Sequence, residues 1–255
     1  MIQALPLERT SRKNFKQIRL HETDFANLWS LDFDLPPELS AGKPPEARGL
    51  ARDEVRLMVS YLSDNRVVHT RFRDIVDFLQ AGDVLVINTS GTLNAALVAT
   101  RADGTPLELH LSTRLPADLW IVELRAPGDE GTTPFFDARA GETLRLPAGG
   151  TVTLHTPHAG ALRSATGAPV RLWIATLDVP SKLESYLAEF GFPIRYGYVR
   201  EEWPISYYQT VYATEPGSAE MPSAGRAFTT ELITKLVARG VRIAPLLLHT
   251  GVASL

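Results

Sequence analysis

The sequence changes character in its middle third, and this change constrains the fold most. Between residues 90 and 178, short runs rich in β-branched and aromatic residues alternate with Gly- and Pro-containing turns, without the period of a helix. Asp103-Gly104 between two apolar runs is typical of a hairpin turn. Further strands are expected at Trp120–Leu124, Thr143–Leu146, Val152–Leu154 and Leu172–Leu177. This pattern predicts a small antiparallel β-barrel.

The sequence before this segment mixes strands with a helix. Strands are expected on both sides of an Asp64-Asn65 turn, at residues 56–62 and 67–69. Phe72, Ile75, Val76 and Leu79 follow the i, i+3, i+4, i+7 spacing of a short helix, and Val84–Ile87 has the length and branching of a buried strand.

The sequence after residue 178 again predicts helices and a strand. Ser181 with Glu184 has the spacing of a capping box at a helix start, and Thr229 is a suitable cap for a second helix. A strand is expected at Val241–Leu248. We therefore predict a mixed α/β (α+β) fold. Residues 31–89 and 179–255 form a discontinuous layered α/β domain, residues 90–178 an inserted β-barrel domain, and residues 1–30 a polar N-terminal extension.

Composition narrows the possible chemistry. The chain has no Cys, which excludes disulfides, thiolate catalysis and Cys-ligated metals. The sequence also lacks the P-loop, Rossmann, G-x-S-x-G and H-E-x-x-H patterns. A 44% hydrophobic content, a 22% charged content and a net charge of −3 are ordinary for a soluble protein, so we expect no membrane span and a cytoplasmic location.

The segment 208–229, YQTVYATEPGSAEMPSAGRAFT, is the best candidate for a ligand loop. It combines aromatic and short polar residues with Gly and Pro turns and has almost no regular hydrophobic period. A strand–helix–strand crossover would place this loop beside Asn88 and beside His249, each of which follows a strand. Both could equally play local roles, Asn88 by closing a turn and His249 by bonding a backbone carbonyl.

Several motifs in this order resemble one family, the S-adenosylmethionine:tRNA ribosyltransferase-isomerases of queuosine biosynthesis. They are Gly82-Asp83-Val84-Leu85-Val86-Ile87-Asn88, Tyr208-Gln209-Thr210-Val211-Tyr212-Ala213, Pro216-Gly217, Pro222-Ser223-Ala224-Gly225, Phe228-Thr229 and Leu248-His249-Thr250-Gly251. The chain departs from the family pattern at Thr89-Ser90-Gly91 and at Arg226-Ala227, where an acid, an Arg and a His are replaced. The family continues beyond the point that matches Leu255, so the chain resembles a divergent, C-terminally truncated member, for which weak ligand binding is expected.

The resemblance implies a reaction and a set of site residues. The family transfers and isomerises the ribosyl group of S-adenosylmethionine onto 7-aminomethyl-7-deazaguanine in tRNA, with S-adenosylmethionine as co-substrate and no metal. His249 is the expected catalytic residue. The expected substrate-binding residues are Asn88, Tyr208, Gln209, Thr210, Tyr212, Ser223, Ala224, Gly225, Thr229 and Gly251.

Physical chemistry supports parts of this assignment but leaves alternatives. Aromatic faces suit a sulfonium cation and an adenine ring, and amides at a helix start suit a carboxylate. Tyr208 and Tyr212 could instead be core residues, and Thr229 could be only a helix cap. A non-catalytic relative that binds S-adenosylmethionine is the alternative function, and a structural module without a ligand is a more distant one. tRNA is the expected partner, and an uncovered apolar strand at the end of the chain would favour a homo-oligomer.

Overall fold

The computed structural model describes residues 34, 36, 39, 41–128, 131–158, 169–195, 199 and 201–252. The chain divides into two compact units, Met1–Ser40 and Ala41–Leu255. The second unit contains every element described below. The boundaries predicted for the discontinuous domain and the inserted domain stay a prediction.

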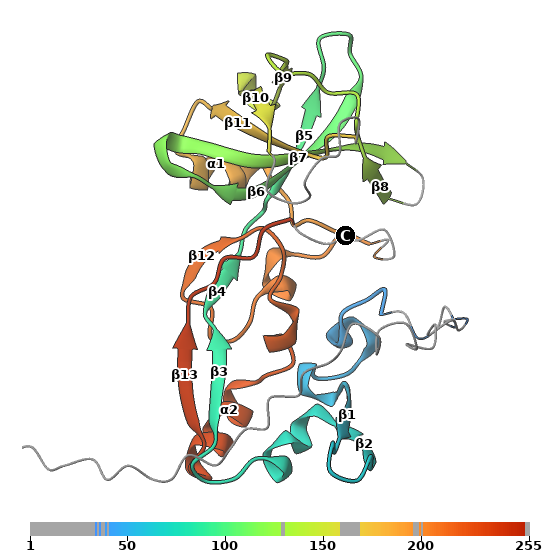
Figure 1. Cartoon of the computed structure of the whole chain (residues 1–255), viewed down its shortest axis with the longest axis vertical. Helices are drawn as coiled ribbons and strands as arrows, with labels where there is room; N and C mark the ends of the chain where they lie inside the picture. Colours follow the sequence, from blue (N-terminus) through green and yellow to red (C-terminus); the bar gives the residue numbers. More distant parts are fainter. Residues whose placement is uncertain are drawn as a thin grey trace, which may run out of the picture. The chain divides into compact units, whose positions relative to one another are not determined.

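A six-stranded antiparallel barrel occupies the middle of the chain (Figure 1). Its strands are β5 (Ala96–Thr100), β6 (Pro106–Arg114), β7 (Leu119–Gly128), β9 (Thr143–Arg145), β10 (Thr151–Pro157) and β11 (Leu172–Asp178), and a seventh strand, β8 (Gly131–Pro134), extends the sheet. The order β11-β10-β9-β5-β6-β7 closes through a β7–β11 pairing, and β8 pairs with the end of β7. Two 3-10 turns, η6 (Pro116–Asp118) and η7 (Pro147–Gly149), lie between strands. The predicted barrel and its strands are confirmed.

The predicted hairpin at Asp103-Gly104 joins β5 to β6. Gly104 has a φ of +90°, which L-residues with a side chain rarely adopt, and the Asp103 carboxylate accepts a hydrogen bond of 2.9 Å from the Thr105 amide. The turn residues therefore fix the register of the two strands, in which Leu97 lies opposite Leu109.

A short helix, α1 (Leu183–Phe190), packs against the core of the barrel. Tyr186 and Leu187 are buried in this core, and the Tyr186 hydroxyl donates a 2.7 Å hydrogen bond to the carbonyl of Pro147. The predicted capping box is wrong. The helix begins at Leu183, so Lys182 is the capping position, and its side chain makes no capping hydrogen bond. Ser181 is one residue too early to reach the first free amides.

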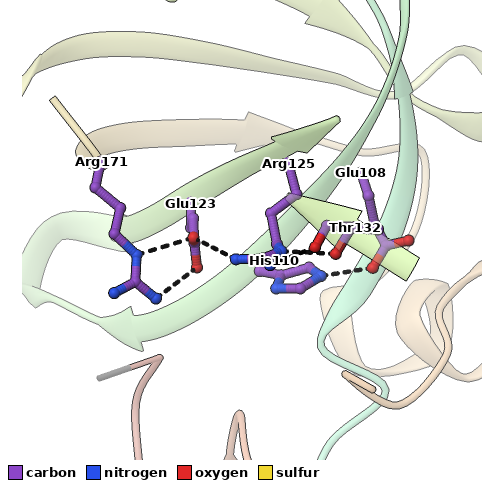
Figure 2. Close-up of polar contacts among 6 residues, drawn as sticks. All are labelled: Glu108, His110, Glu123, Arg125, Thr132 and Arg171. Carbon is purple, nitrogen blue, oxygen red and sulfur yellow. Dashed lines mark hydrogen bonds and ion pairs between the residues drawn. The ribbon is translucent and has the colours of Figure 1, made fainter. Parts of the chain in front are cut away.

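The outer face of β6 and β7 carries a buried charged cluster (Figure 2). The Glu123 side chain is fully buried and accepts hydrogen bonds of 2.8 Å from Arg125 Nη1 and 2.9 Å from Arg171 Nε. His110, which is paired with Glu123 across the two strands, lies with its Nε2 2.6 Å from a Glu108 carboxylate oxygen. A carboxylate between two guanidinium groups thus stabilises this face of the barrel only while all three charges are present.

The remaining elements build an α/β body around a second hydrophobic core. Its strands and helices are β1 (Arg56–Ser60), β2 (Val67–Arg71), β3 (Val84–Asn88), β4 (Ser90–Thr92), β12 (Glu215–Ser218), β13 (Arg242–Leu246) and α2 (Thr230–Ala238), with 3-10 helices η3 (Pro45–Arg48), η4 (Arg52–Glu54), η5 (Phe72–Phe78), η8 (Ile205–Tyr208) and η9 (Ser223–Gly225). Phe228, Leu232, Leu236 and Val241 form its core. The helix expected over Phe72–Leu79 is the 3-10 helix η5, which ends at Phe78, and it packs on this core.

Two pairs of parallel strands bring distant segments together. β13 pairs with β3, and β12 pairs with β4 (Figure 1). The prediction that Val84–Ile87 is a buried strand is wrong in part. Ile87 is buried, but Val84 and Val86 are 58% and 60% exposed, because alternate residues of a strand face opposite sides and only one side is covered. Thr229 caps α2 as predicted, since its hydroxyl accepts a 3.0 Å hydrogen bond from the Leu232 amide.

No helix in the described part of the chain has both the length and the apolar character needed to cross a membrane. Within the same residues, no group of three or more His, Cys, Asp or Glu side chains is arranged to hold a metal ion.

Candidate functional site

His249 lies where the two pairs of parallel strands meet. Its Nδ1 is 2.7 Å from the hydroxyl oxygen of Ser90, and that oxygen is 2.6 Å from the hydroxyl oxygen of Ser218. Ser218 Oγ also accepts a 3.1 Å hydrogen bond from the Thr250 amide. Both serines are buried, whereas His249 is exposed. The histidine is therefore anchored through one ring nitrogen.

Only one direction of hydrogen bonding satisfies every hydroxyl in this chain of contacts. The Ser218 hydrogen has a single acceptor among the described residues, the Ser90 oxygen, so the Ser90 hydrogen must point to His249 Nδ1. The reverse direction would leave a buried hydroxyl without an acceptor, at a cost of about 1–3 kcal/mol. Nδ1 is thus the acceptor, and the neutral ring carries its proton on Nε2, which faces away from the anchor.

Gly217 provides the surface on which the imidazole ring lies. A Cβ atom at this position would lie 2.6 Å from His249 Nε2 and closer still to Cε1 and Nδ1. Since ordinary contacts of a Cβ atom begin near 3.4 Å, no other residue leaves room for the ring where it now lies. The Pro216-Gly217 motif in the sequence therefore has a direct steric role.

Asn88 holds the residue before His249 and does not point its amide at open space. Its Nδ2 donates a 2.8 Å hydrogen bond to the carbonyl of Leu248, and its Oδ1 accepts from the amides of Leu248 and Ser90 at 3.0 and 3.1 Å. The amide thus joins the ends of β3 and β13. Its observed role is the local one considered for the sequence, and it positions His249 indirectly.

Gln209 and Tyr208 attach the ligand-loop candidate to β4. The Gln209 amide exchanges two hydrogen bonds, of 2.8 and 2.9 Å, with the backbone of Thr92, and the Thr92 hydroxyl donates to the carbonyl of Tyr208. The next residue, Thr210, is buried, and its hydroxyl has no partner among the described residues. Ser90 and Thr92, two residues apart on β4, therefore hold His249 and the 208–210 segment respectively.

Tyr212 belongs to the second hydrophobic core. Its ring lies 6.1 Å from the ring of Phe228, and its hydroxyl lies directly against Gly225. Burial raises the pKa of the Tyr212 hydroxyl. Packing is thus the observed role of Tyr212 and of Gly225.

Ser223, Ala224 and Gly225 form the turn η9, and four residues separate this turn from the start of α2. The amides of Gly225 and Arg226 bond back to the carbonyls of Pro222 and Ser223. The Gly225 amide is therefore already bonded within the turn, and the expectation that Ser223 and Ala224 present amides to a ligand stays a prediction.

Gly251 lies at the barrel. A Cβ atom there would lie 2.7 Å from Ser112 Oγ, the same hydroxyl that accepts from the Val252 amide at 2.8 Å. The close approach explains a glycine at this position and ties the segment after His249 to β6.

A cavity of about 410 Å³ adjoins this region. Tyr208 and Ser223 line it, together with Trp203, Tyr207 and Arg226, whereas His249 and Asn88 are not among its lining residues. A short stretch of the chain leads from the residue that supports the histidine ring to a residue that lines the cavity. Gly217 supports the ring and Glu220 lines the cavity, and only Ser218 and Ala219 separate them, so the two features are at most about 11 Å apart along the chain. The Thr250 hydroxyl, which follows His249, donates to the carbonyl of Glu220 at 2.5 Å.

Sequence reasoning missed three residues of the candidate site. Ser90 and Ser218 are isolated serines in the sequence, and only the pairing of β4 with β12 brings them together. Arg226 is a single cation in a loop, and its burial in a cavity wall depends on contacts with residues 19 and 180 positions away. No local pattern marks such residues.

Comparison with known families identifies the family of the chain. A model of the family described as "Queuosine biosynthesis protein" matches residues 28–255. The chain belongs to the queuosine biosynthesis protein family. The match contains every segment that builds the His249 site and the cavity.

Sequence similarity to curated relatives supports this family assignment. S-adenosylmethionine:tRNA ribosyltransferase-isomerases from Thermotoga maritima, Symbiobacterium thermophilum and Thermus thermophilus are 34%, 36% and 34% identical to the chain, over 88%, 89% and 88% of its length. The chain covers only 59–61% of the length of these relatives.

A crystal structure of S-adenosylmethionine tRNA ribosyltransferase from Thermotoga maritima aligns with 25% identity over 86% of this chain and 57% of that chain. Its TM-score is 0.33. Membership of the family rests on the sequence matches.

Proposed function

We propose that the chain binds S-adenosylmethionine and transfers its ribosyl group, with isomerisation, to 7-aminomethyl-7-deazaguanine in tRNA. The observation that carries the proposal is the 34% identity to S-adenosylmethionine:tRNA ribosyltransferase-isomerases over 88% of the chain. The matched residues include both the anchored His249 and the aromatic cavity. Methionine and adenine are the expected leaving products.

The chemistry needs no metal for its first step. A sulfonium is a good leaving group and acidifies the adjacent C5′ protons, so that proton transfer begins the reaction. Later, the bond from the sugar to adenine breaks, and negative charge develops on the departing base.

The anchored imidazole fits that later stage. With Nδ1 accepting from Ser90, the neutral ring presents Nε2–H and acts as a hydrogen-bond donor. Such a donor stabilises the charge that develops on the departing adenine, as preorganised donors do for other leaving groups and oxyanions. We therefore assign His249 to the leaving base, with Ser90 and Ser218 as positioning residues.

The aromatic cavity fits the nucleoside. Its volume of about 410 Å³ lies in the usual range for small-molecule sites. Trp203, Tyr207 and Tyr208 offer faces for an adenine ring and for a sulfonium cation. The ring centroids of Trp203 and Tyr207 are 5.5 Å apart and the rings are tilted by 56°, so the two rings contact each other as a pair in the cavity wall.

The experiment is an incubation of the chain with S-adenosylmethionine and tRNA that carries the 7-aminomethyl-7-deazaguanine base. The expected result is release of methionine and adenine in equal amounts, with the ribosyl mass added to the tRNA. Binding of S-adenosylmethionine without any release would instead identify the chain as a non-catalytic relative. No binding and no release would refute the proposal altogether.

A further inference from the structure

Arg226 is the most unusual side chain in the cavity wall. Its side chain is only 10% exposed. Its Nε donates to the carbonyl of Tyr207 at 2.7 Å and its Nη2 donates to the Glu46 carboxylate at 2.8 Å. Its third nitrogen, Nη1, is buried without any hydrogen-bond partner among the described residues. Such an orphaned donor on a permanently charged group is costly unless a ligand completes it.

The charges around Arg226 do not balance. Glu46 is shared between Arg226 and Arg52, whose Nε lies 3.5 Å from the same carboxylate oxygen. Burial and the charge of Arg226 lower the pKa of Arg52 below its ordinary value. Two guanidinium groups on one carboxylate leave one positive charge in excess, which favours an incoming anion.

The other charged residues of the cavity wall are also mostly positive. Lys43, Arg48 and Arg195 line it with Arg226, and among the described lining residues Glu220 is the one acidic side chain. Lys43 and Arg195 form ion pairs with Glu201 and Glu202, whose side chains are exposed, so solvent weakens these pairs. The Arg226 side chain, at 10% exposed, lies deeper than those of Arg195 and Lys43, at 29% and 51%.

Two neutral donors lie in the same wall without partners. Trp203 Nε1 and the Tyr208 hydroxyl are buried and unbonded among the described residues. Burial also raises the pKa of the Tyr208 hydroxyl, which keeps its proton available as a donor. Aromatic faces, unbonded donors and a buried guanidinium together describe a site for a ligand with a planar ring and an anionic group.

We propose that Arg226 binds the carboxylate of S-adenosylmethionine through Nη1, with the nucleoside held by the aromatic side chains of the cavity. The inference rests on the proposed function and adds the residue that recognises the amino-acid end of the co-substrate. It replaces the Ser223–Gly225 turn, whose Gly225 amide is already bonded within the turn.

The test compares two probes that differ only in the carboxylate, S-adenosylmethionine and decarboxylated S-adenosylmethionine. Calorimetric titration measures the dissociation constant of each probe for the unmodified chain, for Arg226→Leu and for Lys43→Ala. Lys43 lines the same cavity, but its side chain is half exposed and paired with Glu201, so it is the matched control.

A charge-assisted hydrogen bond predicts that the unmodified chain prefers S-adenosylmethionine about 10- to 100-fold. Arg226→Leu abolishes this preference by weakening only the S-adenosylmethionine complex, whereas Lys43→Ala keeps it. Because Arg226→Leu also removes the contacts with Glu46 and Tyr207, its fold is checked by thermal unfolding. Arg226→Lys, which retains the charge without the planar fork, serves if the leucine variant does not fold. The Arg226→Lys variant should keep at most a small part of the preference for S-adenosylmethionine over its decarboxylated form.

A preference that is unchanged in the Arg226 variants, or an equal loss for both probes, overturns this inference and leaves the proposed function intact. If the unmodified chain binds neither probe, the proposed function fails together with the inference.

Discussion

Replacement of Gly217 by Ala tests the placement of His249 with a single methyl group. The added Cβ would lie 2.6 Å from Nε2 and nearer to Nδ1 and Cε1, where about 3.4 Å is needed. The ring must therefore move by roughly 1 Å or more. A shift of this size breaks or lengthens the 2.7 Å hydrogen bond between His249 Nδ1 and Ser90. Gly217 is not at a positive φ, so the backbone itself tolerates alanine.

The expected losses follow from that displacement. One hydrogen bond contributes about 0.5–1.5 kcal/mol to the free energy of unfolding, so stability measured in urea decreases by about 1 kcal/mol. A misplacement of about 1 Å in a reacting group costs on the order of 100-fold in rate, so methionine release slows by that factor. Binding of S-adenosylmethionine should weaken less than the rate falls, because the cavity wall that holds most of the ligand does not include His249.

The matched control is Gly91→Ala on β4. A Cβ atom there meets its nearest neighbours at 3.4 Å, which is ordinary contact, so stability and methionine release should stay close to those of the unmodified chain. If Gly217→Ala keeps full activity, or if Gly91→Ala impairs it equally, the steric argument for His249 is refuted.

Three further predictions concern stability. Thr229→Ala removes the α2 cap and should lower the free energy of unfolding in urea by about 1 kcal/mol, whereas Thr230→Ala, without a capping role, should not; equal effects would contradict the cap. Glu123→Gln leaves two guanidinium groups without their shared carboxylate and should cost about 3 kcal/mol, against less than about 0.5 kcal/mol for Asp118→Asn in an exposed pair; equal costs would refute the role of burial. Burial raises the pKa of Glu46, but the hydrogen bond and charge of Arg226, with Arg52, lower it below 4.5, so this carboxylate stabilises the fold above pH 4.5 and the contribution is lost as the pH falls through the folded pKa. The difference in Tm between the unmodified chain and Glu46→Gln should therefore shrink from pH 6 to pH 3, and a constant difference would show that the ion pair is not responsible.

The sequence predicted the barrel because its signals are local. Turn residues such as Asp103-Gly104 and alternating apolar residues fix each hairpin independently of the rest of the chain. Burial of the α/β strands was harder to predict. Val84 and Val86 are apolar, β-branched residues of the kind found in cores, yet both are exposed. Whether a strand is covered on one face or on two depends on elements distant in the sequence.

The candidate site was likewise predictable only in part. The motifs located His249, Gly217 and the 208–229 loop, and the structure places them together. The roles of individual side chains did not follow from the motifs. The side-chain amides of Asn88 and Gln209 bond to backbone groups close to them in space. Ser90, Ser218 and Arg226 become significant through contacts with residues distant in the sequence, among them the Ser90–Ser218 and Arg226–Glu46 contacts, which span more than 100 residues.

A crystal structure of the chain in complex with S-adenosylmethionine tests the account most directly, because it locates the ligand relative to both the cavity and the histidine. The account predicts the nucleoside against Trp203 and Tyr208, the carboxylate on Arg226 Nη1, and the adenine within hydrogen-bonding distance of His249 Nε2. A ligand bound outside this cavity, or one whose adenine lies away from His249, would contradict it.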